Sequence, residues 1–389
     1  MDTSGVDDEC FDLTRANPLR MQPLDVGMVV AGKYRLDRLI GKGAMGAVYE
    51  ARHELLERRV ALKFISDEHA TTPDCARRFL NEARAAAGIE SEHVAHILDA
   101  GQLDGGAPFM VLEMLDGEDL AQILEDASAR RTPLAAERVV GWVLEALEGL
   151  AEAHALGIVH RDLKPANLFL AKRRDGTSIL KVLDFGISKA RVSGPSAPSP
   201  TLTASSSLLG SPVYMPPEQL RDPRSVDARA DIWALGVVLY ELLTGELPFY
   251  ADNVAELFVA VLEGVVTPIR ARRGDVSPEL EQIVMRCLSR DVEARYRDVA
   301  ELAEALGPLA PLGSHGSIQR IRYMTRSAPW RVGALPEPSL PRRRSRFFAI
   351  ATAVAIGAAA MIALVESGVM HVSSSAPSQT HTPAAAVVH

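Results

Sequence analysis

The stretch that decides the fold reads His160-Arg161-Asp162-Leu163-Lys164-Pro165-Ala166-Asn167, and Asp184-Phe185-Gly186 begins 17 residues after its end. Asp162 can accept a proton from an alcohol. Asn167 and Asp184 offer hard oxygen atoms, which suit Mg²⁺ better than nitrogen or sulfur do. Lys164 follows Asp162 closely enough to meet a phosphoryl group in transit. Each residue type alone is common in turns, but in this order they predict phosphoryl transfer.

The bulk composition restricts the class of protein. A chain of 389 residues is long enough for two or three units, one of them with a substantial core. The formal net charge of −8 argues against a nucleic-acid-binding protein, because no basic domain dominates. Cys10, Cys75 and Cys287 are far apart and odd in number. They predict neither a disulfide framework nor a zinc site, and they favour a reducing cytosol.

Residues 34–309 have the pattern of one globular unit with strands first and helices later. Runs rich in apolar or β-branched residues, bounded by glycine loops or polar turns, predict consecutive antiparallel strands at 34–40, 47–52 and 59–65. Residues 109–114 form a further apolar run. A sheet-rich half followed by a helix-rich half predicts an α+β fold of two lobes with a cleft between them.

Three helices follow from capping signals and from the apolar pattern. Thr72-Pro73 predicts a helix start, with an N-cap and a proline in the first turn, and Gly88 predicts its end. Thr132-Pro133 likewise predicts a second capped helix that runs to Gly157. Residues 232–243 are apolar nearly all round, which predicts a helix buried among others. That segment is too short to cross a bilayer.

The two ends of the chain differ from the middle. Residues 1–33 carry several acids and no apolar run, which predicts an acidic disordered tail and not a secretory signal. Residues 310–346 hold eight arginines and a single acid, as in a basic, proline-containing linker. Residues 347–365 lack charge and would be about 28 Å long as a helix, which predicts a transmembrane helix. The alternative is a buried core helix, but no later domain follows that could bury it.

The charges around the apolar segment predict its orientation. Arginines at 342–344 and 346 precede it, and no lysine or arginine follows it. The positive-inside bias then places residues 34–309 in the cytoplasm and the short tail, 366–389, outside. We therefore expect a single-pass protein of the cell membrane. The same arginines are suited to anionic lipid headgroups.

The two quoted segments resemble the catalytic and metal-binding loops of eukaryotic-type protein kinases. Residues 34–309 as a whole are similar to the bacterial, membrane-anchored serine/threonine protein kinases of this type (Hanks-type). The resemblance implies a bilobal protein-kinase-like fold, ATP as phosphoryl donor, and Mg²⁺, or alternatively Mn²⁺, held by Asn167 and Asp184. It makes Asp162 the catalytic base and Lys164 its partner at the transferred phosphate. Residues 164–167 match the serine/threonine-specific form of the loop.

Residues 41–46, Gly-Lys-Gly-Ala-Met-Gly, fit G-x-G-x-x-G, which alone is a weak signal. In a dinucleotide-binding unit a helix would follow, whereas residues 47–51 predict a returning strand. The motif therefore resembles the glycine-rich hairpin of protein kinases. Lys63 ends a Val-Ala-Leu-Lys run that matches the strand presenting a lysine to the α- and β-phosphates; the alternative is a solvated strand lysine. The nucleotide contacts that the resemblance implies are Ile40, Gly41, Lys42, Gly43, Ala44, Met45, Gly46, Val48, Ala61, Lys63, Glu82, Glu113 and Leu115.

Glu82 is supported separately by periodicity. Phe79, Ala83 and Ala86 form the apolar stripe of the first predicted helix, and Glu82 falls on this stripe. A carboxylate there is costly unless it is paired, and Lys63 is the partner that the resemblance implies. The alternative is a boundary glutamate that reaches solvent. Residues 112–115 match the kinase hinge, whose backbone groups bind the adenine edge.

The segment from 184 to 218 resembles a kinase activation segment and is rich in hydroxyls. Arg161 before the base implies that a negative charge orders this segment. Thr203 and Ser205 stand where related bacterial enzymes carry regulatory phosphates, and we predict autophosphorylation there. The composition is also that of a flexible, solvated loop.

Three positions differ from the family pattern, and two contacts are implied. Ser211 replaces the usual threonine but keeps its hydroxyl, Pro216 replaces alanine or serine and stiffens the substrate loop, and Val292 replaces proline. The resemblance also implies a Glu218–Arg295 pair and an Asp231 carboxylate that caps backbone amides of the catalytic loop.

The leading function is an active protein kinase that phosphorylates Ser or Thr of protein substrates. A pseudokinase scaffold would hold nucleotide without transfer, but every expected catalytic position is filled. A small-molecule kinase is disfavoured by the Pro-Pro-Glu segment and by the Lys164 loop. The membrane is the second expected partner, through residues 347–365, and nucleic acid is not expected. The sequence leaves open whether signals arrive through the basic linker, through dimers or clusters in the membrane, or through another protein.

Overall fold

The computed structural model describes residues 24–43, 46–65, 73–103, 106–185, 212–222 and 226–327. The side chains of residues 73–76, 78, 82 and 327 are not described. All described residues belong to the first of two compact units, residues 1–330. Among them, no helix is both long enough and apolar enough to span a membrane. The predicted transmembrane segment, 347–365, lies outside the described residues, as do residues 1–23 of the predicted tail.

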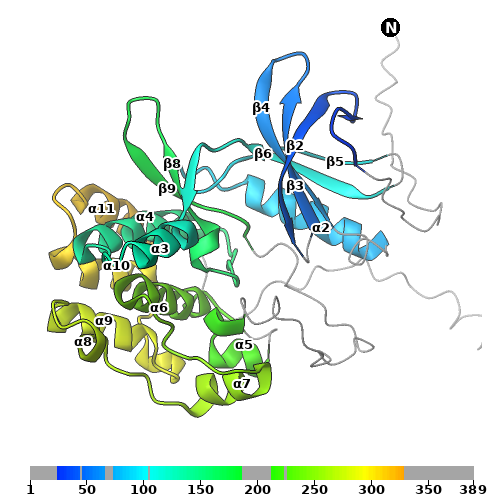
Figure 1. The fold of residues 1–389 in the computed structure, drawn as a ribbon. Helices are drawn as coiled ribbons and strands as arrows, with labels where there is room; N and C mark the ends of the chain where they lie inside the picture. The colour runs from blue at the N-terminus through cyan, green and yellow to red at the C-terminus, as the bar shows by residue number, and fades with distance from the viewer. Residues whose placement is uncertain are drawn as a thin grey trace, which may run out of the picture. The chain divides into compact units, whose positions relative to one another are not determined.

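The first half of the described chain is built on an antiparallel six-stranded sheet (Figure 1). Its strands, in spatial order, are β1 (Val29–Val30), β2 (Tyr34–Gly43), β3 (Gly46–His53), β4 (Arg58–Ile65), β6 (Pro108–Glu113) and β5 (Ile97–Gln102). The three predicted strands correspond to β2, β3 and β4, so this part of the prediction is confirmed. The apolar run at 109–114 forms β6.

Alternation along β4 separates a core face from a functional face. Leu62 and Phe64 are fully buried in a cluster with strands β2, β3 and β6. Lys63 is half-buried and points the other way, because successive strand side chains alternate. On that second face, α2 (Pro73–Ala87) packs Phe79 against Met110. The predicted apolar stripe of α2 is therefore confirmed, and Lys63 lies on the sheet face that α2 covers.

The second half is helical, with a small sheet in the order β7-β8-β9 at its edge. Its elements are β7 (Gly117–Asp119), α3 (Leu120–Ala129), α4 (Ala136–Ala155), β8 (Leu168–Lys172), β9 (Ser178–Val182), α5 (Pro217–Arg221), α6 (Arg229–Thr244), α7 (Val254–Glu263), α8 (Ile269–Arg272), α9 (Pro278–Cys287), α10 (Val299–Leu306) and α11 (His315–Ser327). The predicted buried helix at 232–243 is confirmed as α6. The predicted order of a sheet-rich half and a helix-rich half is confirmed as well.

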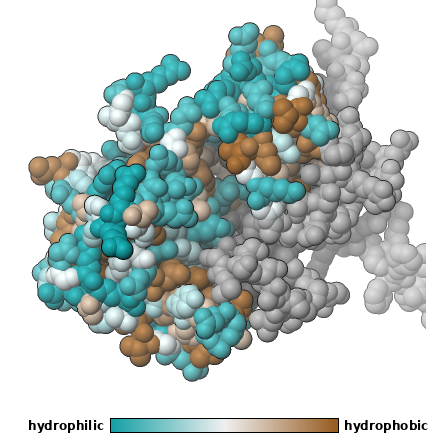
Figure 2. All heavy atoms as spheres, in the orientation of Figure 1, coloured by the Kyte–Doolittle hydropathy of each residue, from teal (hydrophilic) through white to brown (hydrophobic). Residues whose placement is uncertain are grey.

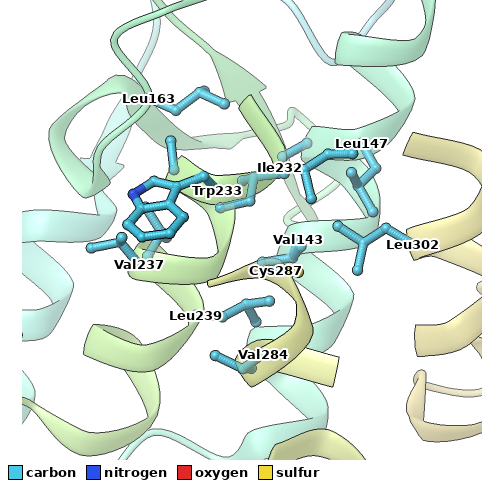
Figure 3. Close-up of a cluster of buried hydrophobic side chains, with 14 of the residues drawn as sticks. Val143, Leu147, Leu163, Ile232, Trp233, Val237, Leu239, Val284, Cys287 and Leu302 are labelled. Carbon is cyan, nitrogen blue, oxygen red and sulfur yellow. The ribbon is translucent and has the colours of Figure 1, made fainter. Parts of the chain in front are cut away.

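Helix α6 is the centre of the helical core (Figure 3). Ile232, Trp233 and Leu239 have no exposed surface, and the Trp233 ring stacks on Phe249 at a centroid distance of 5.6 Å. Gly236 allows α9 to approach, since a Cβ built there would lie 2.6 Å from Cys287 Cβ. The outer face shown in Figure 2 is mostly hydrophilic, and its apolar patches are scattered.

The predicted helix start at Thr132-Pro133 is wrong. Arg131, two residues after the end of α3, adopts a positive φ of 52°, and the Thr132 hydroxyl donates back to Arg130 O at 3.3 Å. These residues complete the turn after α3, which the sequence analysis did not predict. Helix α4 begins only at Ala136, without a side-chain cap at Ala135.

The stretch assigned to a basic linker also differs from expectation in its first part. Helix α11 folds within it and lies beside α4 and α10 (Figure 1). Ile321 is fully buried, and Ile318 and Met324 pack against the helical core. These apolar residues recur every three positions, but the arginines between them obscure this pattern in the sequence.

Candidate functional site

The catalytic-loop segment and the Asp184 segment meet through their backbones and one amide side chain. Leu183 N donates to Asn167 O at 2.8 Å. The Asn167 Nδ2 donates to Asp162 O at 2.8 Å. These contacts bring the loop that carries Asp162 and Asn167 next to the residue that precedes Asp184. The two segments therefore meet, whereas the catalytic and metal-binding roles of their residues stay predictions.

Asp231, at the start of α6, fixes the catalytic loop by hydrogen bonds. Its carboxylate accepts from His160 N and Arg161 N, each at 2.9 Å, and from His154 Nε2 at 2.7 Å. The predicted capping role is confirmed. Burial alone would raise the pKa of the Asp231 carboxyl, but the hydrogen bonds from His154 and from the His160 amide outweigh it and lower the pKa. Asp231 therefore stays ionised in the core.

His160 links the two segments as a neutral ring, a role that the sequence analysis did not assign. Its Nε2 donates to Leu183 O at 2.8 Å, and its Nδ1 accepts from Asp162 N at 3.2 Å. Burial lowers the pKa of His160, which agrees with one donor and one acceptor on the ring.

Lys63 meets Asp184 across the two halves of the chain. Lys63 Nζ lies 2.7 Å from Asp184 Oδ1. Enclosure in the site would raise the pKa of the Asp184 carboxyl, but the Lys63 ammonium outweighs this and lowers the pKa. Asp184 itself has a positive φ of 52°, an uncommon conformation for a non-glycine residue. The Glu82 side chain lies outside the description, so its pairing with Lys63 stays a prediction.

Asp162, the predicted base, and Lys164, its predicted partner at the phosphate, lie next to each other. Lys164 Nζ lies 3.4 Å from Asp162 Oδ2, and the Asp162 side chain is largely buried. The donor set also fits a hard cation. Because the Asn167 Nδ2 is committed to Asp162 O, the amide oxygen is turned away from that carbonyl, and together with the Asp184 carboxylate it offers oxygen ligands.

The glycine motif forms the predicted hairpin. Gly41 pairs with Val48, Lys42 with Ala47 and Gly43 with Gly46 in an antiparallel register. Gly46 has a φ of +147°, and a Cβ there would lie 1.8 Å from Phe64 O. Nothing lies within 4 Å of a Cβ built on Gly41 or Gly43. Of the other predicted contacts on this hairpin, Ile40 is exposed, whereas Ala44 and Met45 lie outside the described residues.

Strand register places the remaining nucleotide contacts on the face of Lys63. Val48 pairs directly with Lys63, and Ala61 lies one alternation away on β4, opposite Leu112 of β6. Both are half-buried, as is Leu115 just after β6. Val48 and Ala61 therefore lie beside Lys63 on one face of the sheet, in agreement with their predicted role as nucleotide contacts.

Glu113, at the end of β6, has a side-chain role that the sequence did not indicate. Its Oε1 accepts from His96 N and from Lys181 Nζ, both at 2.8 Å. Its backbone N donates to His96 O at 3.0 Å. The hinge segment is thus held by His96, just before β5, and by Lys181 of β9.

The end of the activation segment is anchored as predicted. Arg295, whose side chain is fully buried, contacts Glu218 through two nitrogens at 2.6 and 2.8 Å. Pro216 precedes α5, and the Tyr214 hydroxyl donates to Glu241 at 2.7 Å. Ser211, Thr203 and Ser205 lie outside the described residues.

Comparison with known proteins agrees with this arrangement. The protein kinase domain family matches residues 34–305, which is more than half of the chain. The chain belongs to the protein kinase family. The bilobal kinase fold expected from the sequence is thereby confirmed for the described residues, and family members use ATP with a divalent metal.

Two curated relatives and one solved kinase domain show the degree of similarity. Serine/threonine-protein kinase pkn3 of Myxococcus xanthus is 39% identical over 268 residues, covering 68% of this chain and 48% of that protein. PknB of Mycolicibacterium smegmatis is 35% identical over 277 residues, covering 70% and 42%. The chain thus spans less than half the length of either relative. The crystal structure of the Mycobacterium tuberculosis PknI kinase domain aligns with a TM-score of 0.57 at 28% identity, covering 74% of this chain and all of that one.

Proposed function

We propose that this kinase transfers the γ-phosphate of ATP to Ser and Thr hydroxyls of proteins. The observation that carries the proposal is the contact of Lys63 from β4 with Asp184, whose neighbour Leu183 is bonded to the loop of Asp162 and Asn167. Similarity to pkn3 and PknB, which are named serine/threonine-protein kinases, supports the same activity.

The residues divide the work of phosphoryl transfer. Lys63 neutralises and orients the ATP phosphates. Asp162 aligns the substrate hydroxyl with the γ-phosphorus and accepts its proton, while Lys164 stabilises charge on the group in transit. A Mg²⁺ ion held by Asn167 and Asp184 would supply further charge neutralisation. Most of the acceleration then comes from positioning and electrostatics, because the transition state is loose.

The direct test is to incubate the purified chain with γ-labelled ATP and a generic basic protein. We expect label on Ser and Thr, and its loss in Asp162→Asn. A pseudokinase would bind nucleotide and transfer nothing. A small-molecule kinase would consume ATP only when metabolites replace the protein. Either result would overturn the proposal.

We also propose autophosphorylation at Thr203 and Ser205. The backbone of Arg161 is fixed, because its N donates to Asp231 and its O accepts from Gln219 Nε2 at 3.2 Å. The Arg161 side chain therefore projects from a fixed backbone next to the catalytic base. A guanidinium in this place is suited to bind a phosphate on the activation segment. Mass spectrometry after incubation with ATP should find phosphate at these two residues. Absence of phosphate between 193 and 207 would contradict the proposal.

Membrane anchoring through residues 347–365 is a further proposal, with the kinase domain in the cytoplasm and the tail 366–389 outside. The uncharged segment and the arginines before it support this. The full chain should stay in the membrane fraction after alkaline extraction, and a variant lacking 347–365 should be released. Release of both would contradict anchoring. Dimers or clusters in the membrane would then be measurable by crosslinking of the full chain.

A further inference from the structure

Helix α11 is part of the folded body although it follows the family match, which ends at residue 305. It packs along α4 (Figure 1). A Cβ on Gly141 of α4 would lie 3.0 Å from Pro311, just before α11. Helix α11 is also the last described element before residues 328–389.

One charged pair joins α11 to the inside of the domain. Arg320 Nη2 contacts Glu148 Oε2 at 3.0 Å, and Arg320 Nε contacts Glu148 Oε1. The Glu148 side chain, on α4, is only 7% exposed. A carboxylate buried to this extent needs a cation and hydrogen bonds, and the arginine fork supplies both.

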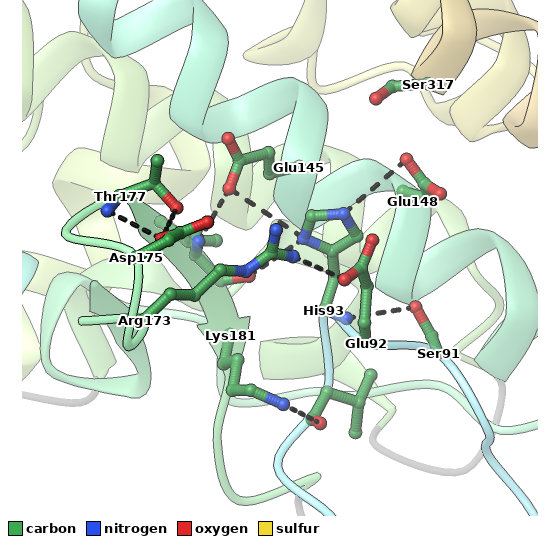
Figure 4. Close-up of polar contacts among 12 residues, drawn as sticks. Ser91, Glu92, His93, Glu145, Glu148, Arg173, Asp175, Thr177, Lys181 and Ser317 are labelled. Carbon is green, nitrogen blue, oxygen red and sulfur yellow. Dashed lines mark hydrogen bonds and ion pairs between the residues drawn. The ribbon is translucent and has the colours of Figure 1, made fainter. Parts of the chain in front are cut away.

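Glu148 is shared with a histidine from a different part of the chain (Figure 4). His93 Nε2 lies 3.6 Å from Glu148 Oε2, and His93 Nδ1 lies 2.9 Å from Leu180 O. A carbonyl oxygen only accepts, so Nδ1 is the donor and Nε2 faces the carboxylate. Glu145 is a second carboxylate near this ring, and its Oε2 accepts from Leu180 N at 2.6 Å. Arg320 is therefore the guanidinium partner of Glu148 beside this ring.

His93 lies in the loop 88–96, which joins α2 to β5. A Cβ on Gly149 of α4 would lie 2.8 Å from His93 O, so the loop rests directly on α4. The next residue, Val94, accepts through its O from Lys181 Nζ at 3.3 Å, and Lys181 also contacts Glu113. Nearer β5, His96 N donates directly to Glu113 Oε1 at 2.8 Å. The loop thus contacts both α4 and the hinge residue Glu113.

We propose that Arg320 is a positioning residue for the nucleotide site, through which α11 holds loop 88–96 in place. The connected contacts run from Arg320 through Glu148 to His93, and from the same loop through Lys181 to Glu113. Movement of α11 withdraws the cation from Glu148, loosens the loop and displaces the hinge. The effect on nucleotide rests on the proposed function, whereas the effect on the loop does not.

The test compares Arg320→Met with Arg322→Met in the full chain. Arg322 is a matched control on the same helix, because it contacts Glu304 of α10 at 2.8 Å and not α4. Hydrogen exchange of amides 89–97 reports the loop, amides of α6 report global opening, and a fluorescent ATP analogue reports affinity. We expect about tenfold faster exchange at 89–97 and several-fold weaker nucleotide binding in Arg320→Met only, with α6 unchanged.

A second variant keeps the proposal testable if Arg320→Met fails to fold. Glu148→Gln removes the buried charge, and combined with Arg320→Met it should restore much of the loop protection, because no unpaired carboxylate remains. Equal exchange at 89–97 in Arg320→Met and Arg322→Met would overturn the coupling, as would a double variant no better protected than Arg320→Met. A chain that transfers no phosphate yet shows the loop response would refute only the proposed function.

Discussion

Lys63 Nζ and Asp184 Oδ1 are 2.7 Å apart, so the lysine of β4 is paired with the carboxylate proposed to bind metal. The pair joins the two halves of the domain directly. It also means that the Lys63 ammonium lowers the pKa of the Asp184 carboxyl.

Lys63→Met should therefore lower the phosphorylation rate by at least about 10²-fold, the scale for losing one group that stabilises charge. It should also change the pH profile. Without the ammonium, the main influence that lowers the pKa of the Asp184 carboxyl is lost, so the pKa rises and activity is lost at a higher pH on the acid side. The measurement is kcat/KM against pH. Full activity with an unmoved acid limb would contradict the assigned role, and Lys33→Met, at an exposed lysine of the same lobe, is the control.

The glycines of the hairpin should respond differently to alanine. Gly46→Ala forces a Cβ into Phe64 O at a positive φ, which should destabilise the sheet and abolish activity. Gly41→Ala has open space, so thermal stability should hold while ATP affinity falls, because the methyl group keeps phosphate away from the backbone. Thermal unfolding and nucleotide titration separate the two effects. Equal losses of stability would contradict the geometry.

Arg295→Met should reduce the free energy of unfolding by about 3 kcal/mol, because it leaves Glu218 without its buried partner. Arg297→Met is the matched control two residues away. The Arg297 side chain is 81% exposed and contacts Asp298, so its loss should change stability by less than about 1 kcal/mol. Urea denaturation measures both, and similar values would argue against the anchoring role of Arg295.

Asp231 should make stability sensitive to acid. Its pKa is lowered on folding, so its contribution is complete above the unfolded pKa, near 3.8, and is lost as the pH falls through the lower folded value. Asp231→Asn should thus be less stable than the wild type at neutral pH, by about 3 kcal/mol for a broken buried pair. The gap should shrink below about pH 4. A gap that is constant with pH would show that charge is not the cause.

Much of the fold was predictable because local signals and tertiary contacts agree. Strands β2, β3 and β4, helix α2 and helix α6 follow from alternation, a glycine stop and an apolar run. The start of α4 was not predictable, since Thr132-Pro133 carries a capping signal that the structure uses in a turn after Arg131. Helix α3 was missed altogether, and α11 was hidden by its arginines.

The candidate site, like the fold, was predictable only in part. Spacing predicted that Asp162, Asn167 and Asp184 converge, and the Glu218–Arg295 pair followed from the resemblance. Which carboxylate meets Lys63 depends on how the lobes are placed, which periodicity within α2 does not encode. The same applies to the contact between Glu148 and His93. These two residues are far apart in the sequence and meet only because α4 lies against loop 88–96.

The close approach of α6 and α9 at Gly236 has a practical consequence for labelling. It encloses the Cys287 thiol, and burial raises its pKa to about 12. Thiolate is the species that maleimides attack, so Cys287 should stay unlabelled in the native domain. With Cys10 and Cys75 replaced by serine, a single cysteine introduced on α11 could carry a spin label or a fluorophore without disturbing the core.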